Sequence, residues 1–266
     1  MSTTIESRDR MIDILSLSYL GDLLREQLGD DAENYIWPDD FEKAVADIGF
    51  MGTVYRGEAS PWDVIFVGRA PQATMTTTLS PSASYRSVRF VAFEGNIPAN
   101  LFRSQTNLVE VQFPTAPFTI GTTSFVGCTS LEEVTADNAV GFIGTQAFAN
   151  CTALKKVHFP KMTNLVSSGG APANGHFSGC TSLELFEIGS EGYTVTAVAQ
   201  NTFNLCTQSG LTITIYTNGS HADTLVSDVR RYATNATIII KASEATTYNG
   251  TSYAAGDTIL TSEVTS

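Results

Sequence analysis

The fold is decided by one stretch, Ile120-Gly-Thr-Thr-Ser-Phe-Val-Gly-Cys-Thr-Ser-Leu-Glu-Glu-Val134, which returns 23 residues later as Ile143-Gly-Thr-Gln-Ala-Phe-Ala-Asn-Cys-Thr-Ala-Leu-Lys-Lys-Val157. The same offset carries Ile97 of an earlier copy onto Ile120, and it reaches back to a half repeat that starts at Tyr85. After Val157 the spacing loosens, because Phe148, Phe177 and Phe203 lie 29 and then 26 residues apart. A repeat of this length with Leu at fixed positions predicts a stacked solenoid.

The pattern Ile-Gly-x-x-x-Phe-x-x-Cys-Thr-x-Leu-x-x-Val resembles the BspA-type leucine-rich repeat, which occurs in bacterial surface proteins, some protists and some bacteriophage proteins. The resemblance covers about residues 85–216. It implies a β-rich solenoid with a parallel sheet on one face and irregular or short helical turns on the other. Gln105 replaces the first Cys, and two residues are added between Cys206 and Leu211, as expected of atypical terminal repeats.

Each repeat carries the alternation of a half-buried strand. Val157 and Phe159 alternate with Lys156 and His158, so the apolar pair is expected to face the solenoid interior. The repeat offset then predicts one inward column on adjacent parallel strands, formed by Val88, Val111, Val134, Val157 and Phe186.

The outward positions of the same strands form a polar surface, which is our candidate binding surface. It consists of Arg89, Glu110, Gln112, Glu133, Thr135, Lys156, His158 and Glu187. Carboxylates on neighbouring strands, such as Glu110 and Glu133, could share a cation. The alternative interpretation is a solvated, charged face without a ligand.

Composition limits the class of protein and of partner. The chain has 266 residues, of which 42% are hydrophobic and 16% charged, and a net charge of −12. It is therefore expected to be globular, with no nucleic acid and no anionic membrane surface as partner, because both need clustered Lys and Arg. No segment approaches the ~20 apolar residues that cross a bilayer. Charged residues interrupt the first thirty, so no secretory signal is recognised, which favours a virion or cytoplasmic location, with the extracellular cell surface as the alternative.

All four cysteines, Cys128, Cys151, Cys180 and Cys206, occupy one repeat position. Successive strands lie ~4.8 Å apart, which predicts a ladder of sulfur atoms along the solenoid axis. Their spacing matches no zinc motif. Buried free thiols are therefore expected, a disulfide between adjacent rungs is the alternative, and no cofactor is expected.

The flanking segments complete the predicted organisation. Residues 1–50 read as helical, with an apolar stripe over 5–28 and a second helix over 38–48, and serve as a cap or an assembly module. Residues 51–84 are expected to form short strands and a linker, and residues 85–216 the solenoid. Residues 217–266 are expected to form a small α/β cap, with a helix over 222–232, a strand over 236–240, a hairpin at Asn249-Gly250 and a frayed end. The insertion at 167–175 reads as a loop, either passive or lining a binding face.

The predicted function is attachment without catalysis. The three histidines lie in no motif of known chemistry, so we expect no enzyme but a binding or structural module for a protein or cell-surface glycan. The first hypothesis is a phage virion component, such as a receptor-binding tail or head fibre, in which residues 1–50 form a homo-oligomer or join a larger particle. The alternative is a secreted bacterial adhesin, and an enzyme on a solenoid scaffold is the third.

Overall fold

The structure is a computed structural model that describes residues 12–13, 52–56, 61–67, 84–91, 93–165, 175–199 and 201–262. These residues fall into two compact units. Unit 1 comprises residues 1–95 with 107–116, and unit 2 comprises 96–106 with 117–266. The predicted helix over 38–48, most of the linker before Tyr85 and nearly all of the predicted loop at 167–175 lie outside the described residues.

Unit 1 contains one five-stranded sheet in the order β1-β2-β3-β4-β5. The β2–β3 pair is antiparallel and the other neighbours are parallel. The strands are β1 Ile12–Asp13, β2 Gly52–Arg56, β3 Trp62–Val67, β4 Tyr85–Val91 and β5 Glu110–Gln112.

The helix expected over residues 5–28 needs a correction at its described part. Ile12 and Asp13 are extended and pair with Val54 and Tyr55 of β2. An outer strand exposes unpaired backbone groups, and an extended segment beside it satisfies them where a helix cannot. The other residues of that predicted helix lie outside the described part of the chain.

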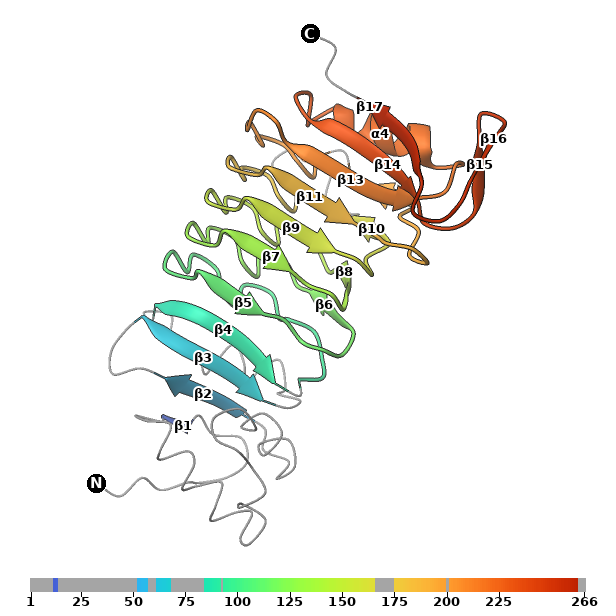
Figure 1. The fold of residues 1–266 in the computed structure, drawn as a ribbon. Coiled ribbons are helices and arrows are strands. Elements are labelled where there is room, and N and C mark those ends of the chain that lie inside the picture. The colour runs from blue at the N-terminus through green and yellow to red at the C-terminus, as the bar shows by residue number, and fades with distance from the viewer. Residues whose placement is uncertain are drawn as a thin grey trace, which may run out of the picture. The chain divides into compact units, whose positions relative to one another are not determined.

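Unit 2 is built on a six-stranded sheet in the order β17-β14-β13-β11-β9-β7. All neighbours are parallel except β17, and the arrows from β7 to β14 run side by side as successive coils (Figure 1). The parallel sheet and the solenoid predicted from the repeat are thereby confirmed. The strands are β7 Glu133–Thr135, β9 Lys156–Phe159, β11 Leu185–Ile188, β13 Thr212–Thr217, β14 Thr237–Ala242 and β17 Thr258–Ser262.

A second strand face completes each coil of unit 2. It consists of the parallel pairs β6–β8 and β10–β12, from which the chain enters a turn containing a buried phenylalanine. These strands are β6 Phe118–Ile120, β8 Ala139–Phe142, β10 Asn164–Leu165 and β12 Ala197–Val198.

The predicted inward column is found within each unit. In unit 1, Val88 pairs with Val111, which is half-buried on the last strand of its sheet. In unit 2 the buried residues Val134, Val157 and Phe186 are in register, and Ile213 and Ile238 extend the column. The step from Val111 to Val134 joins different units and stays a prediction.

Five buried phenylalanines form a second column inside unit 2. Neighbouring rings stack, with centroids 5.2, 5.0, 5.5 and 6.3 Å apart from Phe102 through Phe125, Phe148 and Phe177 to Phe203. Each coil is too small to bury such a ring alone, so every coil completes the core of its neighbours.

The residue two positions after each of these phenylalanines adopts a left-handed backbone. Its φ lies between 60° and 79° at Ser104, Gly127, Asn150, Gly179 and Leu205. In the first four of these residues the N–H group donates to a carbonyl of the next coil, 2.7–2.9 Å away. Gly and Asn suit the position because they enter this region most easily.

At one repeat position the strand pairing differs from the correspondence that the 23-residue offset predicts. Ile97 and Ile120 are buried, but Ile143 is 53% exposed, and Phe142 pairs with Ile120 instead. A register shift between Phe118 and Thr119 accommodates the change. The Phe142 ring stacks 4.0 Å from the buried His176 ring and meets further phenylalanine rings edge-on, so Phe142 is half-buried against the core while Ile143 is exposed.

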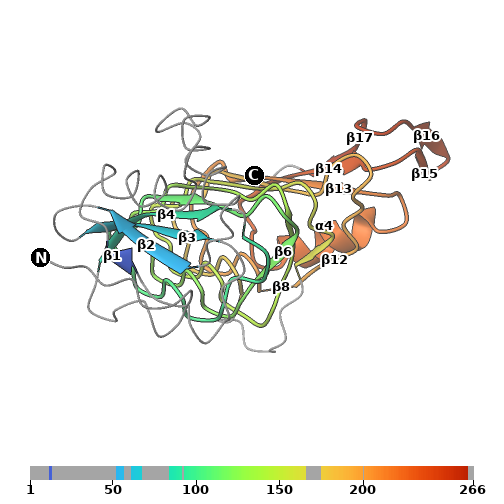
Figure 2. The same cartoon turned by 90° about the horizontal axis from the view of Figure 1, so that it is seen from below.

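The C-terminal region closes unit 2. Helix α4, Ala222–Arg230, buries Ala222, Leu225 and Val229 and lies on the inner side of β13 and β14 (Figure 2). The predicted hairpin is present as β15 Thr246–Tyr248 and β16 Thr251–Tyr253. The frayed end expected after it is corrected up to Ser262, because β17 pairs with β14 and the Arg230 guanidinium donates to the Ser262 carbonyl at 2.7 Å. Residues 263–266 lie outside the described part of the chain.

The four thiols are free, buried and arranged as a ladder. Each donates to the phenylalanine carbonyl of the preceding coil at 3.1–3.2 Å, from Cys128 to Phe102 up to Cys206 to Phe177. A hydrogen bond with the Cys151 thiol and burial raise the pKa of Cys128, and burial raises the pKa of Cys180. Burial also raises the pKa of Cys206 to about 12.

These raised pKa values predict a loss of stability at alkaline pH. Above about pH 9 the unfolded chain releases thiol protons that the folded chain retains, so the free energy of unfolding falls until the folded thiol ionises near pH 12. Each thiol contributes a slope of about 1.4 kcal/mol per pH unit. Urea titrations between pH 9.5 and 11 should give Cys206→Ala a slope shallower by that amount than the wild type. Equal slopes would show that this thiol already titrates in the folded protein.

Candidate binding surface

A local irregularity creates the most polar part of unit 1. Trp62 of β3 pairs with Tyr85 of β4, but the next pair is Asp63 with Ser87, which leaves Arg86 as an extra residue. Tyr85 and Val88 are buried on either side. Arg86 and Ser87 therefore both face outward, as expected at a bulge, where two residues oppose one.

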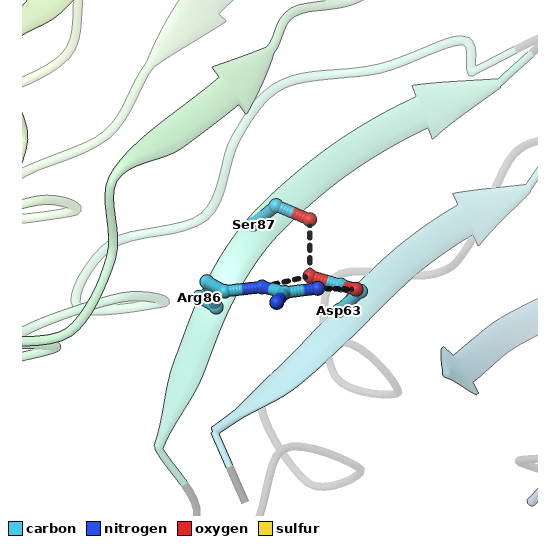
Figure 3. Close-up of polar contacts among 3 residues, drawn as sticks. All are labelled: Asp63, Arg86 and Ser87. Atoms are coloured by element: carbon cyan, nitrogen blue, oxygen red, sulfur yellow. Dashed lines mark hydrogen bonds and ion pairs between the residues drawn. The ribbon is translucent and has the colours of Figure 1, made fainter. Parts of the chain in front are cut away.

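Both side chains converge on Asp63 (Figure 3). The Arg86 guanidinium donates from Nε to Oδ1 at 3.1 Å and from Nη2 to Oδ2 at 2.5 Å. The Ser87 hydroxyl donates to Oδ1 at 2.7 Å. The hydrogen bonds and charge of Asp63 raise the pKa of Arg86, so the guanidinium stays charged at any physiological pH. The bulge thus fixes one carboxylate with three donors.

A shallow depression of about 140 Å³ lies beside this cluster. Its lining residues are Asp63, Val64, Ser87, Val88, Arg89, Glu110 and Gln112. The Gln112 amide donates to the Glu110 carboxylate at 2.7 Å. The depression therefore offers guanidinium and amide donors next to carboxylate acceptors in a mostly polar lining, a set that suits a hydroxyl-bearing or amide-bearing ligand better than a simple anion.

The predicted surface residues of unit 2 occupy two neighbouring outward columns. Glu133 is in register with Lys156, and Thr135 with His158 and Glu187. The His158 ring nitrogen Nδ1 lies 3.7 Å from Glu187 Oε2, with both side chains about a third exposed. The structure thus brings Arg89, Glu110 and Gln112 together in unit 1 and the other five predicted residues together in unit 2.

Sequence reasoning missed Asp63 and Arg86. The 23-residue repeat length could have identified them, because it separates Asp63 from Arg86. Arg86 lies in the half repeat that starts at Tyr85, and Asp63 lies one repeat length before it. The same offset joins other hydrogen-bonded pairs of side chains, namely Ser84 with Asn107, Glu132 with Lys155 and Asn138 with Lys161. Polar side chains separated by one repeat length are candidates for such pairs.

The described residues contain neither a cluster of metal ligands nor a membrane-spanning helix. Within them, no three His, Cys, Asp or Glu side chains gather as a metal site would require. Glu110 and Glu133, for which a shared cation was considered, belong to different units. In the same part of the chain, no helix has the length and apolar character needed to span a bilayer.

Comparison with known protein families identifies the repeat. A family model described as "BspA type Leucine rich repeat region" matches six copies over residues 95–222. A leucine-rich repeat protein from Bacteroides ovatus is similar at 16% sequence identity and a TM-score of 0.28, over 62% of this chain and 64% of that protein, so the chain spans less than two thirds of its length. No curated protein matches the sequence.

The Asp63 cluster predicts a salt-dependent contribution to stability. In Asp63→Asn the carboxylate charge is lost while the shape is kept, so the melting temperature should fall at low ionic strength. That difference should shrink in 1 M NaCl, because Arg86 is 60% exposed and its attraction is screened. Thermal melts of both proteins at the two salt concentrations test this. A difference that salt leaves unchanged would mean that packing, and not charge, holds the cluster together.

Proposed function

Residues 95–222 belong to the BspA-type leucine-rich repeat family, and we propose that the chain attaches to a protein or glycan target through the outward side chains of its sheets. A leucine-rich repeat chain of this kind is a binding or structural module. The observation that supports attachment through the sheets is their mixed polar face, with Lys156 and His158 standing on one strand beside Glu133 and Glu187 on its neighbours.

Rigid strands make such a face selective. Side chains on neighbouring strands are held ~4.8 Å apart, so the pattern of donors and acceptors is fixed before a ligand arrives. The net charge of −12 favours a partner that is not itself strongly anionic. A protein surface or a glycan meets both conditions.

The test uses two charge swaps that leave the net charge unchanged. The surface swap is Glu133→Lys with Lys156→Glu. The control swap is Glu132→Lys with Lys155→Glu, which changes the same residue types at adjacent positions and exchanges an exposed ion pair of 2.7 Å. Fluorescently labelled full-length protein is titrated onto a panel of bacterial cells and bound label is measured by flow cytometry.

We expect the surface swap to weaken cell binding at least tenfold, since like charges would face the partner's complementary groups. The control swap should bind as the wild type does, and both should keep its melting temperature. Equal binding by the two swaps would contradict attachment through this surface.

We further propose that residues 1–50 join the chain to an assembly, as in a phage tail or head fibre or in a cell-surface adhesin. The supporting observation is the sequence pattern that follows β1, in which Leu17, Leu20 and Leu24 recur at three and four residues. A stripe of this kind needs an apolar partner surface. Neighbouring genes for tail or capsid proteins would favour the virion, and a secretion locus the adhesin.

Light scattering on the full chain tests the assembly. The wild type should exceed the 28.5 kDa of one chain. Leu20→Glu with Leu24→Glu should reduce it to a monomer, because charges on the stripe oppose its burial, while Arg25→Glu on the polar side should leave the mass unchanged. A monomeric wild type would refute the proposed oligomer.

A further inference from the structure

The β15–β16 hairpin projects away from the buried core of unit 2. Figures 1 and 2 both show it extending away from the main sheet beside α4. Thr247, Asn249, Gly250, Thr251 and Ser252 are exposed. An isolated two-stranded hairpin is at best marginally stable in water, so burial does not explain why this one is ordered.

Specific contacts hold the hairpin in one conformation. Asn249 and Gly250 have φ values of 48° and 81°, as the tight type I′ turn requires. The Tyr248 hydroxyl donates to Asp223 Oδ1 of α4 at 2.6 Å. At the base, Gly219 N–H donates to Thr246 Oγ1 at 3.0 Å, and a side chain on Gly219 would collide with the Thr247 carbonyl. These contacts define the turn, one side and the base of the projection.

The composition of the hairpin is that of a recognition loop. Residues 246–253 read Thr-Thr-Tyr-Asn-Gly-Thr-Ser-Tyr and carry no charge. Tyrosine supplies contact area at a small cost in conformational entropy, and Ser, Asn and Gly supply adaptable hydrogen bonding, which is why binding loops of antibodies are rich in these residues. Nothing in the solenoid repeat calls for this combination.

We propose that the hairpin inserts into a cleft on a partner protein, separately from the polar sheet face. A protruding tip suits a concave protein surface, whereas small-ligand and sugar sites are usually concave themselves. Carboxylates flank the uncharged tip, with Asp223 bonded to Tyr248 and with Glu244 and Asp257 exposed beyond its two ends. The charge pattern fits a cleft rimmed by Lys or Arg side chains.

Two glycines provide a matched pair of variants. Gly250 and Gly192 have φ values of 81° and 82°, and a side chain at either would meet no atom within 4 Å. Gly250→Ala and Gly192→Ala therefore introduce the same backbone strain, but only the first disturbs the hairpin turn. Ser252→Arg adds a positive charge to the exposed hairpin, and Thr152→Arg adds one to an exposed turn of the solenoid.

Labelled full-length variants are titrated onto the same panel of bacterial cells, used untreated, after protease digestion, or after periodate oxidation of surface glycans. We expect Gly250→Ala and Ser252→Arg each to weaken binding at least tenfold, with Gly192→Ala and Thr152→Arg unchanged. Protease digestion should abolish wild-type binding and periodate should not.

Wild-type binding by both hairpin variants would overturn the inference, and so would binding that periodate abolishes and protease spares. The swap of Glu133 and Lys156 separates the two proposals. If that swap alone abolishes binding, the sheet face binds and the hairpin does not. If only the hairpin variants abolish binding, the hairpin binds and the sheet face does not. A wild type that binds no cell in the panel contradicts both.

Discussion

In unit 2 the carbonyl oxygen of a turn phenylalanine accepts two hydrogen bonds, one from its own coil and one from a cysteine thiol that ties it to the next coil. Phe125, for example, accepts from the Cys128 N–H of its own coil at 3.2 Å and from the Cys151 thiol of the following coil at 3.1 Å. The repeated Phe-x-x-Cys spacing follows from this arrangement. Cysteine suits the position because it is a small apolar residue that still carries a weak donor, so a buried carbonyl is satisfied without a strongly polar side chain in the core.

The same coil-to-coil contacts explain how a loosened repeat keeps a regular sheet. The phenylalanine spacing changes from 23 to 29 and 26 residues, yet β7, β9, β11 and β13 stay in register. Extra residues between a strand and the next phenylalanine turn cost little, since loop-closure entropy rises only slowly with length. Inward residues are constrained by packing, whereas outward residues such as Lys156 and His158 are not part of the buried core.

The predictable features were those that recur at the repeat offset. Alternation of Val157 and Phe159 with Lys156 and His158 identified the strands and their inward faces, because burial on one side of a strand leaves a period of two. The shared position of the cysteines predicted the thiol ladder. In the candidate surface, the same logic brought Glu110 and Gln112 next to Arg89.

The remaining features depend on competition between contacts that sequence spacing does not rank. Phe142, and not Ile143, packs against the core because its ring reaches several buried aromatic rings. The bulge at Arg86 shifted the pairing by one residue, so that Arg86 and Ser87 both face outward, which strict alternation along β4 does not predict. Strand β17 has no counterpart in the repeat, and its pairing with β14 depends on partners far away in the sequence. Local patterns carry little information on such contacts.

The central claim is that unit 2 is stabilised by contacts between neighbouring coils, which double-mutant cycles on the phenylalanine column measure directly. Phe125→Leu and Phe148→Leu change rings in adjacent coils with centroids 5.0 Å apart. Their effects on the free energy of unfolding should be coupled by about 0.5–1.5 kcal/mol. Phe102→Leu and Phe177→Leu lie three coils apart and should be additive within about 0.5 kcal/mol. Equal coupling in the two cycles would contradict a core assembled coil by coil.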